Sequence, residues 1–268
     1  MELSTLTIDQ FQQSQSHGLF WDSEIRHKVF ELPECKNDTQ KFDVSCNKNK
    51  FNEKENISIK TSGNTNIDCG DILRFFDRDD DLDITIILIR YNQQKDQKMI
   101  REIIEINYSN ELKNILFGTI TRDILENYVQ MVKKIPSGKV SDEDKRIYKK
   151  EKKELQQKYN MKINISPKID SKNQRRVQCS ITKLDELFED YPKFILSRTT
   201  SNCIRGKLIT SVIDSGKRKR NEKEKCKGEG EGEDKDKDKD KDKGKDKDKD
   251  KNKDKNKKPV DIEFIIID

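Results

Sequence analysis

Hydrophobic and polar positions change their pattern twice between residues 56 and 91. Residues 56–61 form a short apolar and β-branched run with Lys60 near its end, which is typical of a strand. Residues 62–66 (Ser, Gly, Asn, Thr, Asn) favour a turn. Residues 68–76 have helical spacing, with Ile72, Leu73, Phe75 and Phe76 on one face. Residues 82–91 are nearly all apolar, so we expect a strand buried on both faces and a βαβ-like unit.

Two elements are predicted before this unit. Residues 18–32 have helical spacing, with Asp22 or Ser23 as a candidate N-cap and Pro33 as the stop. Residues 41–46 alternate, which predicts a short strand with Asp43 on the face opposite to Phe42 and Val44.

The elements predicted after the unit alternate between strands and helices. We expect a strand at 98–108, helices at 111–117 and 121–135, an exposed charged helix at 141–158, a two-stranded arm at 161–181, a short helix at 184–190 and strand pieces within 194–213. These elements indicate an α/β (α+β) fold, in which a mixed central sheet is flanked by helices.

Composition changes sharply at residue 217. Residues 217–258 carry 20 Lys/Arg and 14 Asp/Glu in low-complexity repeats, and we expect them to be disordered because they can bury little apolar area. Before them we expect a polar lead-in (1–16), an α/β core (17–135) and a C-terminal part of the same domain (136–216). After them, the apolar peptide 259–268 can add an edge strand, bind a protein partner or remain a frayed end.

The charge balance does not by itself predict a nucleic-acid partner. Residues 1–216 contain 36 basic and 34 acidic residues, so the basic character of the chain comes largely from its tail. The six cysteines form no CxxC pair and the two histidines lie far from any paired cysteines, which argues against zinc and for free thiols in a reducing compartment. We find no membrane-length apolar stretch or secretion signal, so we expect an intracellular protein, cytoplasmic or nuclear.

The order helix, strand, strand, helix, strand carries a resemblance to a known family. Glu24 lies on the helix, Asp43 on the first strand, and Ser58-Ile59-Lys60 on the second, 15 residues after Asp43. This resembles the core of the PD-(D/E)XK nuclease superfamily, to which many restriction endonucleases belong. The segments 16–30, 57–63 and 67–76 also resemble proteins of giant DNA viruses assigned to that superfamily, so a viral factory is a further candidate location. The resemblance covers roughly residues 18–108.

The resemblance implies a DNA endonuclease that depends on Mg²⁺ or Mn²⁺. It implies a metal held by Asp43, Ser58, Glu24 and Asp71, with Asp43, Glu24 and Lys60 as catalytic residues. Ser58 and Lys60 share one face of the strand because Ile59 points the other way. Lys60 then holds the attacking water or stabilises charge in the transition state. Many restriction-type nucleases are homodimers, but no self-complementary surface can be recognised in this sequence.

This sequence departs from the family pattern at Ser58, where the superfamily has an acidic residue. A hydroxyl is a neutral ligand, so one negative charge is missing. Three sources can replace it, namely Glu24, Asp68 or Asp71 at the start of the next helix, and Glu55. Glu24 can instead pair with Lys28 on the helix surface, and Asp71 can act as a helix-start residue.

Candidate nucleic-acid contacts lie outside this strand pair. Arg74 can contact phosphate or pair with an acid in 77–81. The arm carries side chains of the kind that read DNA grooves, which are Gln174, Arg175, Arg176 and Gln178. The arm can equally be an exposed polar hairpin, and the basic run 217–220 can bind phosphates or act as a nuclear signal.

Three hypotheses follow from the sequence. The first is a metal-dependent DNA endonuclease built on Asp43 and Lys60. The second is the same fold without catalysis, which Ser58 favours, binding DNA or a protein through Arg175, Arg176 and the basic run. The third is an interaction protein in which the residue pattern is coincidental, which the charged tail and its apolar end would suit.

Overall fold

The computed structural model describes residues 16–33, 41–78, 81–169 and 174–214, which all belong to one compact unit. The expected lead-in, except for Ser16, the charged tail and the apolar terminal peptide lie outside these residues. Within the described ranges, no helix combines the length and apolar character needed to cross a membrane.

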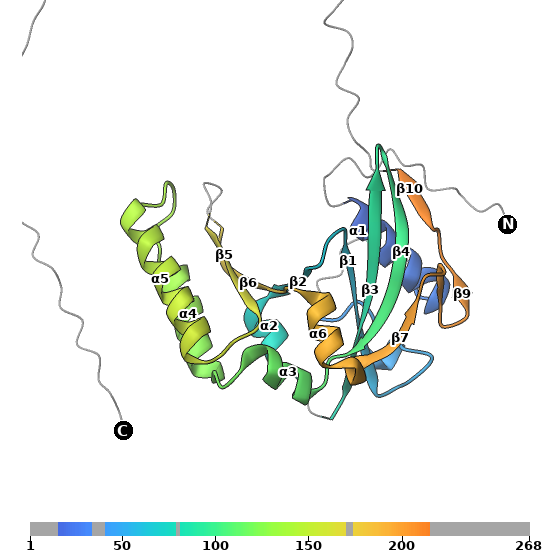
Figure 1. Ribbon diagram of the computed structural model, residues 1–268, viewed down its shortest axis with the longest axis horizontal. Coiled ribbons are helices and arrows are strands. Elements are labelled where there is room, and N and C mark those ends of the chain that lie inside the picture. The colour runs from blue at the N-terminus through green and yellow to red at the C-terminus, as the bar shows by residue number, and fades with distance from the viewer. Residues whose placement is uncertain (1–15, 34–40, 79–80, 170–173, 215–268) are drawn as a thin grey trace, which may run out of the picture. The chain divides into compact units, whose positions relative to one another are not determined.

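The centre of the fold is a mixed sheet (Figure 1). Its strands follow the order β1 (Glu55–Ser62), β3 (Asp83–Gln94), β4 (Gln97–Asn107) and β10 (Val212–Asp214), and β7 (Ile195–Thr199) also pairs with β4. β1 and β3 are parallel, with Lys60 opposite Leu88, and the other pairs are antiparallel. The predicted crossover between two parallel strands is therefore confirmed.

Seven consecutive residues of β3 are buried, from Ile84 to Arg90, so this strand is covered on both faces as its composition predicted. Its side chains alternate between two hydrophobic clusters. Ile87 and Ile89 pack with Trp21 and Ile25 of the N-terminal segment, whereas Ile86 and Leu88 belong to the cluster that contains the remaining helices. The helices therefore flank the sheet on both sides, which confirms the mixed α+β class.

The N-terminal helix α1 (Ser16–Glu24) continues into one π-helical turn, η2 (Ile25–Val29), beside β1 (Figure 1). The predicted caps, Asp22 and Ser23, are wrong because both lie inside α1.

The strand predicted at 41–46 is also wrong. Only Val44 pairs with β1, through two backbone hydrogen bonds with Ile57, and η3 (Cys46–Lys48) follows as a 3₁₀ turn. Asn side chains compete for the backbone here: Asn56 Oδ1 accepts from the Cys46 amide and Asn49 Oδ1 from the Phe51 amide.

The crossover contains more than the predicted helix. Residues 67–71 form strand β2 (Ile67–Asp71), and only α2 (Ile72–Phe76) is helical. The strand forms because β6 (Arg175–Ile181) offers a partner, with Asp68 opposite Ser180 and a bulge before Gly70, whose φ of +78° suits glycine. Asp71 ends the strand and caps the helix, since its Oδ1 accepts from the Arg74 amide at 3.0 Å.

A second sheet, in the order β2-β6-β5, is built from the predicted two-stranded arm, β5 (Asn164–Ile169) and β6 (Arg175–Ile181). The predicted helices are confirmed as α3 (Asn110–Phe117), α4 (Arg122–Lys133), α5 (Asp142–Lys158) and α6 (Leu184–Asp190), with α5 exposed. Short elements complete the described chain, namely η4 (Pro192–Phe194), β8 (Cys203–Ile204) and β9 (Lys207–Leu208).

Candidate functional site

Asp43, Ser58 and Lys60 meet at the free edge of β1. The bridge at Val44 brings Asp43 alongside the strand, where its Oδ2 accepts from the Ile59 amide at 2.6 Å. Ser58 Oγ lies 3.4 Å and Lys60 Nζ 3.8 Å from the same oxygen. The Asp43 carboxylate therefore accepts the hydrogen bond that a carbonyl of a neighbouring strand would otherwise accept from the Ile59 amide. This hydrogen bond positions Asp43 although residues 41–46 do not form a regular strand.

These residues line a pocket of about 200 Å³. Asp71 and Arg74, from the crossover, line the same pocket, so five of the predicted residues share one space. The side chains of Asp43 and Lys60 keep 30% and 26% of their surface exposed, so a solvated ligand can reach both.

Glu24, the acid predicted from the first helix, is engaged elsewhere. Its carboxylate accepts from the amide of Thr210 at 2.9 Å and from Thr210 Oγ1 at 2.6 Å, and it pairs with Lys28 at 2.5 Å. Glu24 therefore holds the segment before β10 against α1, and the alternative of an i,i+4 pair with Lys28 is confirmed.

Asp22 is a buried acid on α1. Its Oδ1 is buried and has no hydrogen-bond partner among the described residues. The pKa of Asp22 is raised from 3.8 to about 7, mainly by burial and also by the charge of Asp43, while the charges of Arg26 and Lys60 act in the opposite direction. Asp22 is thus electrostatically coupled to both Asp43 and Lys60.

The helical spacing of the sequence already indicated that Asp22 is buried. The interpretation of Asp22 as an N-cap residue overlooked this spacing. Asp22, Ile25 and Val29 are spaced i, i+3, i+7, and both apolar members are fully buried. An acid within the buried stripe of a helix is unusual and indicates a specific role.

The other acids proposed to replace the charge missing at Ser58 differ in whether they can reach the pocket. Asp71 lines the pocket while capping α2. Asp68 accepts from the Gly70 amide at 2.9 Å and lines a different pocket. Glu55 is engaged by Arg205 at 2.8 Å and by Thr85 at 2.5 Å, so it cannot turn toward Lys60 without breaking both contacts.

The arm exists, but it does not present Arg175 as a groove-reading side chain. Arg175 Nε donates to the Ile135 carbonyl at 3.0 Å, and Nη2 donates to the carbonyls of Pro136 and Gly138. The guanidinium therefore holds the end of the α4 segment against β6. Gln174 and Gln178 are half-buried and Arg176 is exposed.

Arg74 is exposed on α2 and lines the pocket. Asp77, one of the acids proposed to pair with it, binds Arg122, with 3.1 Å between Oδ1 and Nε.

The donor set fits a divalent cation that keeps part of its water. Among the described residues, no group of three or more His, Cys, Asp or Glu side chains is arranged to hold a metal. Mg²⁺ is commonly held by one or two carboxylates together with waters and phosphate oxygens. Asp43 lines the pocket, and Asp22 on α1 has a buried oxygen without a hydrogen-bond partner among the described residues. No family model, curated protein or solved structure matches the chain, so its chemistry has to be inferred from these residues.

Proposed function

We propose that the chain is a metal-dependent nuclease that hydrolyses DNA phosphodiester bonds at the pocket beside β1. The observation that carries the proposal is the meeting of Asp43, Ser58 and Lys60 at one accessible pocket, with Ser58 Oγ 3.4 Å and Lys60 Nζ 3.8 Å from Asp43 Oδ2. Asp43 and Lys60 line one accessible pocket, and Asp22 is electrostatically coupled to both. Carboxylates and a lysine are the groups that this hydrolysis can use. The parallel pairing of β1 with β3 across a crossover is the arrangement that the resemblance to the nuclease superfamily implies.

Asp22 offers an answer to the departure at Ser58. The missing acidic side chain of the strand is replaced by a carboxylate from α1, so the pocket keeps two negative charges when both acids are ionised. Two neighbouring carboxylates resist joint ionisation, and a bound cation would remove that penalty. The oxygen of Asp22 that has no hydrogen-bond partner among the described residues would then be a ligand atom for the cation.

Each side chain has a separate role in this proposal. Asp22 and Asp43 would hold Mg²⁺ or Mn²⁺, which neutralises the phosphate and lowers the pKa of a bound water. Lys60 holds the attacking water or stabilises the charge that develops on phosphate, and its ammonium is already kept near Asp43 by an ion pair of 3.8 Å. Ser58 supplies a neutral hydroxyl beside Asp43.

The test is cleavage of supercoiled plasmid and of single-stranded DNA by the full chain with Mg²⁺, Mn²⁺ or chelator. Asp43→Asn, Lys60→Met and Asp22→Asn are compared with Glu24→Gln and Lys54→Met, which change the same side-chain types outside the pocket. We expect metal-dependent cleavage that the first three substitutions abolish and the last two retain. Unchanged cleavage in Asp43→Asn and Lys60→Met would overturn the proposal.

A second function, nucleic-acid binding without cleavage, is favoured by one observation. Ser58 leaves β1 without its own acidic ligand, and the described residues contain no group of three metal-binding side chains. This alternative predicts DNA binding that persists in chelator and no cleavage with any divalent metal.

A further inference from the structure

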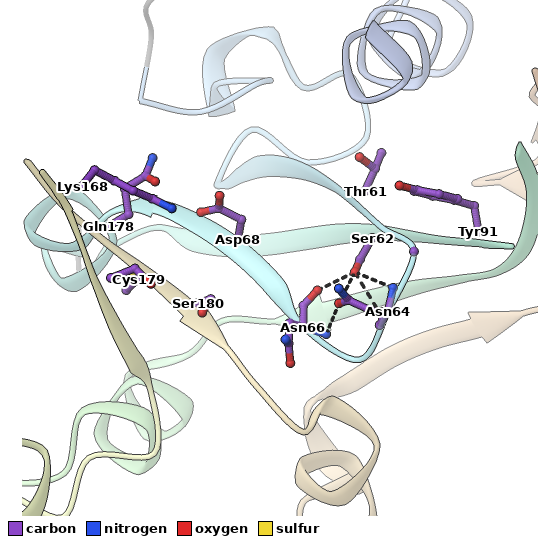
Figure 2. A pocket seen from close by; sticks show the side chains of 12 residues that line it. Thr61, Ser62, Asn64, Asn66, Asp68, Tyr91, Lys168, Gln178, Cys179 and Ser180 are labelled. Atoms are coloured by element: carbon purple, nitrogen blue, oxygen red, sulfur yellow. Dashed lines mark hydrogen bonds between the residues drawn. The ribbon is translucent and has the colours of Figure 1, made fainter. Parts of the chain in front are cut away.

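A second pocket, of about 310 Å³, lies next to the candidate site (Figure 2). The turn between β1 and β2 forms one wall through Ser62 and Asn64. β5 and β6 contribute Lys168 and Gln178, and Tyr91 comes from β3. Figure 2 shows Asp68, Lys168 and Gln178 together on one side and Tyr91 on the other.

The turn that forms this wall is held in one conformation by its own hydrogen bonds. Ser62 Oγ donates to the Asn66 carbonyl at 2.5 Å, and Asn64 Oδ1 accepts from the Asn66 amide at 2.7 Å (Figure 2). Gly63 brings the turn close to Tyr91, since a Cβ at this position would lie 3.0 Å from the tyrosine ring. The pocket is therefore preformed, which lowers the entropic cost of binding.

The lining is polar and carries both signs of charge. Lys168 offers an ammonium for one phosphate, and Gln178 offers an amide that can donate and accept at a base edge. Asp68 uses one carboxylate oxygen for the Gly70 amide and retains acceptor capacity for a sugar hydroxyl or a base amino group. A ligand with one phosphate, a sugar and a hydrogen-bonding base matches this set.

The two pockets share a wall. On β1, Lys60 lines the candidate site and Thr61 lines the second pocket. On β2, Cys69 lines the candidate site and Asp68 lines the second pocket. The two pockets therefore border consecutive residues of β1 and of β2, which places them next to each other along these strands.

We infer that this pocket binds one unpaired nucleotide adjacent to the phosphate that is cleaved, an inference that rests on the proposed function. Hydrogen bonds to a base edge inside a pocket require the base to leave the stack of a duplex. A duplex clamp would need many cations to neutralise phosphates, yet residues 1–216 are nearly charge-balanced and Arg175 is bound to carbonyls. The substrate class is therefore single-stranded nucleic acid or DNA with unpaired bases.

The test measures binding by fluorescence anisotropy, in chelator and at low salt. The probes are a labelled eight-nucleotide single strand and the blunt duplex of the same sequence. Lys168→Ala and Gln178→Ala are compared with Lys153→Ala and Gln157→Ala, which remove the same side-chain types from the exposed helix α5. Thermal unfolding of each variant confirms that the fold is retained.

We expect the wild type to bind the single strand more tightly than the duplex. Each pocket substitution should weaken single-strand binding about tenfold, because each removes a hydrogen bond to the nucleotide, and the α5 substitutions should not. Equal or tighter binding of duplex, or pocket variants that behave like the α5 variants, would overturn the inference.

Failure of the inference and failure of the proposed function give different results. Single-strand preference that depends on Lys168 and Gln178, without cleavage, supports the pocket and rejects the nuclease. Cleavage that depends on Asp43, without single-strand preference, supports the nuclease and rejects the pocket.

Discussion

β1 carries an acid–base cluster at each end, and the two differ in how completely their polar atoms are satisfied. At its start, Arg205 binds Glu55 and Glu105 through hydrogen bonds with nitrogen-to-oxygen distances of 2.8–2.9 Å. Near its other end, Lys60 lies 3.8 Å from Asp43, and Asp22 has a buried oxygen without a hydrogen-bond partner in the described part of the chain. The first cluster is saturated, whereas the second retains capacity for a ligand.

The pKa shifts separate the two clusters in the same way. Burial alone raises the pKa of Glu55, but hydrogen bonds from Arg205, Thr85 and Asn49 outweigh it and leave the pKa below its ordinary value. Burial also raises the pKa of Asp22, and the charge of Asp43 adds to the rise. In the Arg205 cluster, two acids are paired with a cation and stabilise the fold. In the Lys60 cluster, the same kinds of group are incompletely paired and form a candidate site.

The largest effect should come from Lys60→Met. We expect cleavage to fall about 10²–10³-fold, because the side chain that positions water or stabilises the transition state is lost. The free energy of unfolding should change little, since a half-exposed ion pair contributes little to stability. Initial rates of plasmid nicking measure the loss of cleavage, and urea titrations measure the free energy of unfolding. An equal loss of cleavage in Lys54→Met would contradict the assignment.

Arg205→Met should break the saturated cluster. Glu55 and Glu105 would remain buried without their cation, so we expect a loss of about 3–5 kcal/mol in the free energy of unfolding. Urea unfolding measures this loss. The exposed lysine in Lys207→Met is a control that should remain near the wild type, and a change of similar size in both variants would refute the comparison.

Asp22→Asn should have opposite effects on activity and stability. Cleavage should be lost, while the metal-free protein at neutral pH should gain about 1–3 kcal/mol, because a buried charge without a partner is removed. Thermal unfolding in chelator measures the gain. A variant less stable than wild type would show that Asp22 is a structural residue.

The pH dependence of stability should distinguish the two acids. The folded-state pKa of Asp22 is raised from 3.8 to about 7, so its contribution is fully present below pH 3.8 and is lost as the pH rises to about 7. The folded-state pKa of Glu55 is lowered from 4.5, so its contribution is present above pH 4.5 and is lost as the pH falls. Urea titrations across this pH range should show that Asp22→Asn loses the decrease in stability at rising pH and that Glu55→Gln loses the decrease at falling pH. Stability profiles identical to the wild type would refute the assignment.

The local pattern of apolar and polar residues was sufficient to predict the helices and strands whose partners lie nearby in the chain. The strand now seen as β3, the capped helices α3 to α5 and the two-stranded arm were predicted because apolar period and turn residues act over a few positions. The grouping of Asp43 with Lys60 was also predicted from the sequence, by resemblance to the nuclease superfamily.

Distant contacts decided the remaining features. Residues 67–71 became a strand because β6, more than a hundred residues later, supplied hydrogen bonds. Glu24 accepts a hydrogen bond from the amide of Thr210, and Arg175 donates one to the carbonyl of Ile135. Both partners lie in other parts of the chain. Asp22 is buried because α1 packs on the sheet through Trp21, the residue before it.

The sequence by itself therefore determined the class of fold, the strand that carries Lys60 and the residue types available for chemistry. Only the tertiary structure decided which acids stay unsatisfied and which are consumed by hydrogen bonds. The physical reason is that apolar period is a local property of the chain, whereas the satisfaction of a polar group depends on partners brought together by folding.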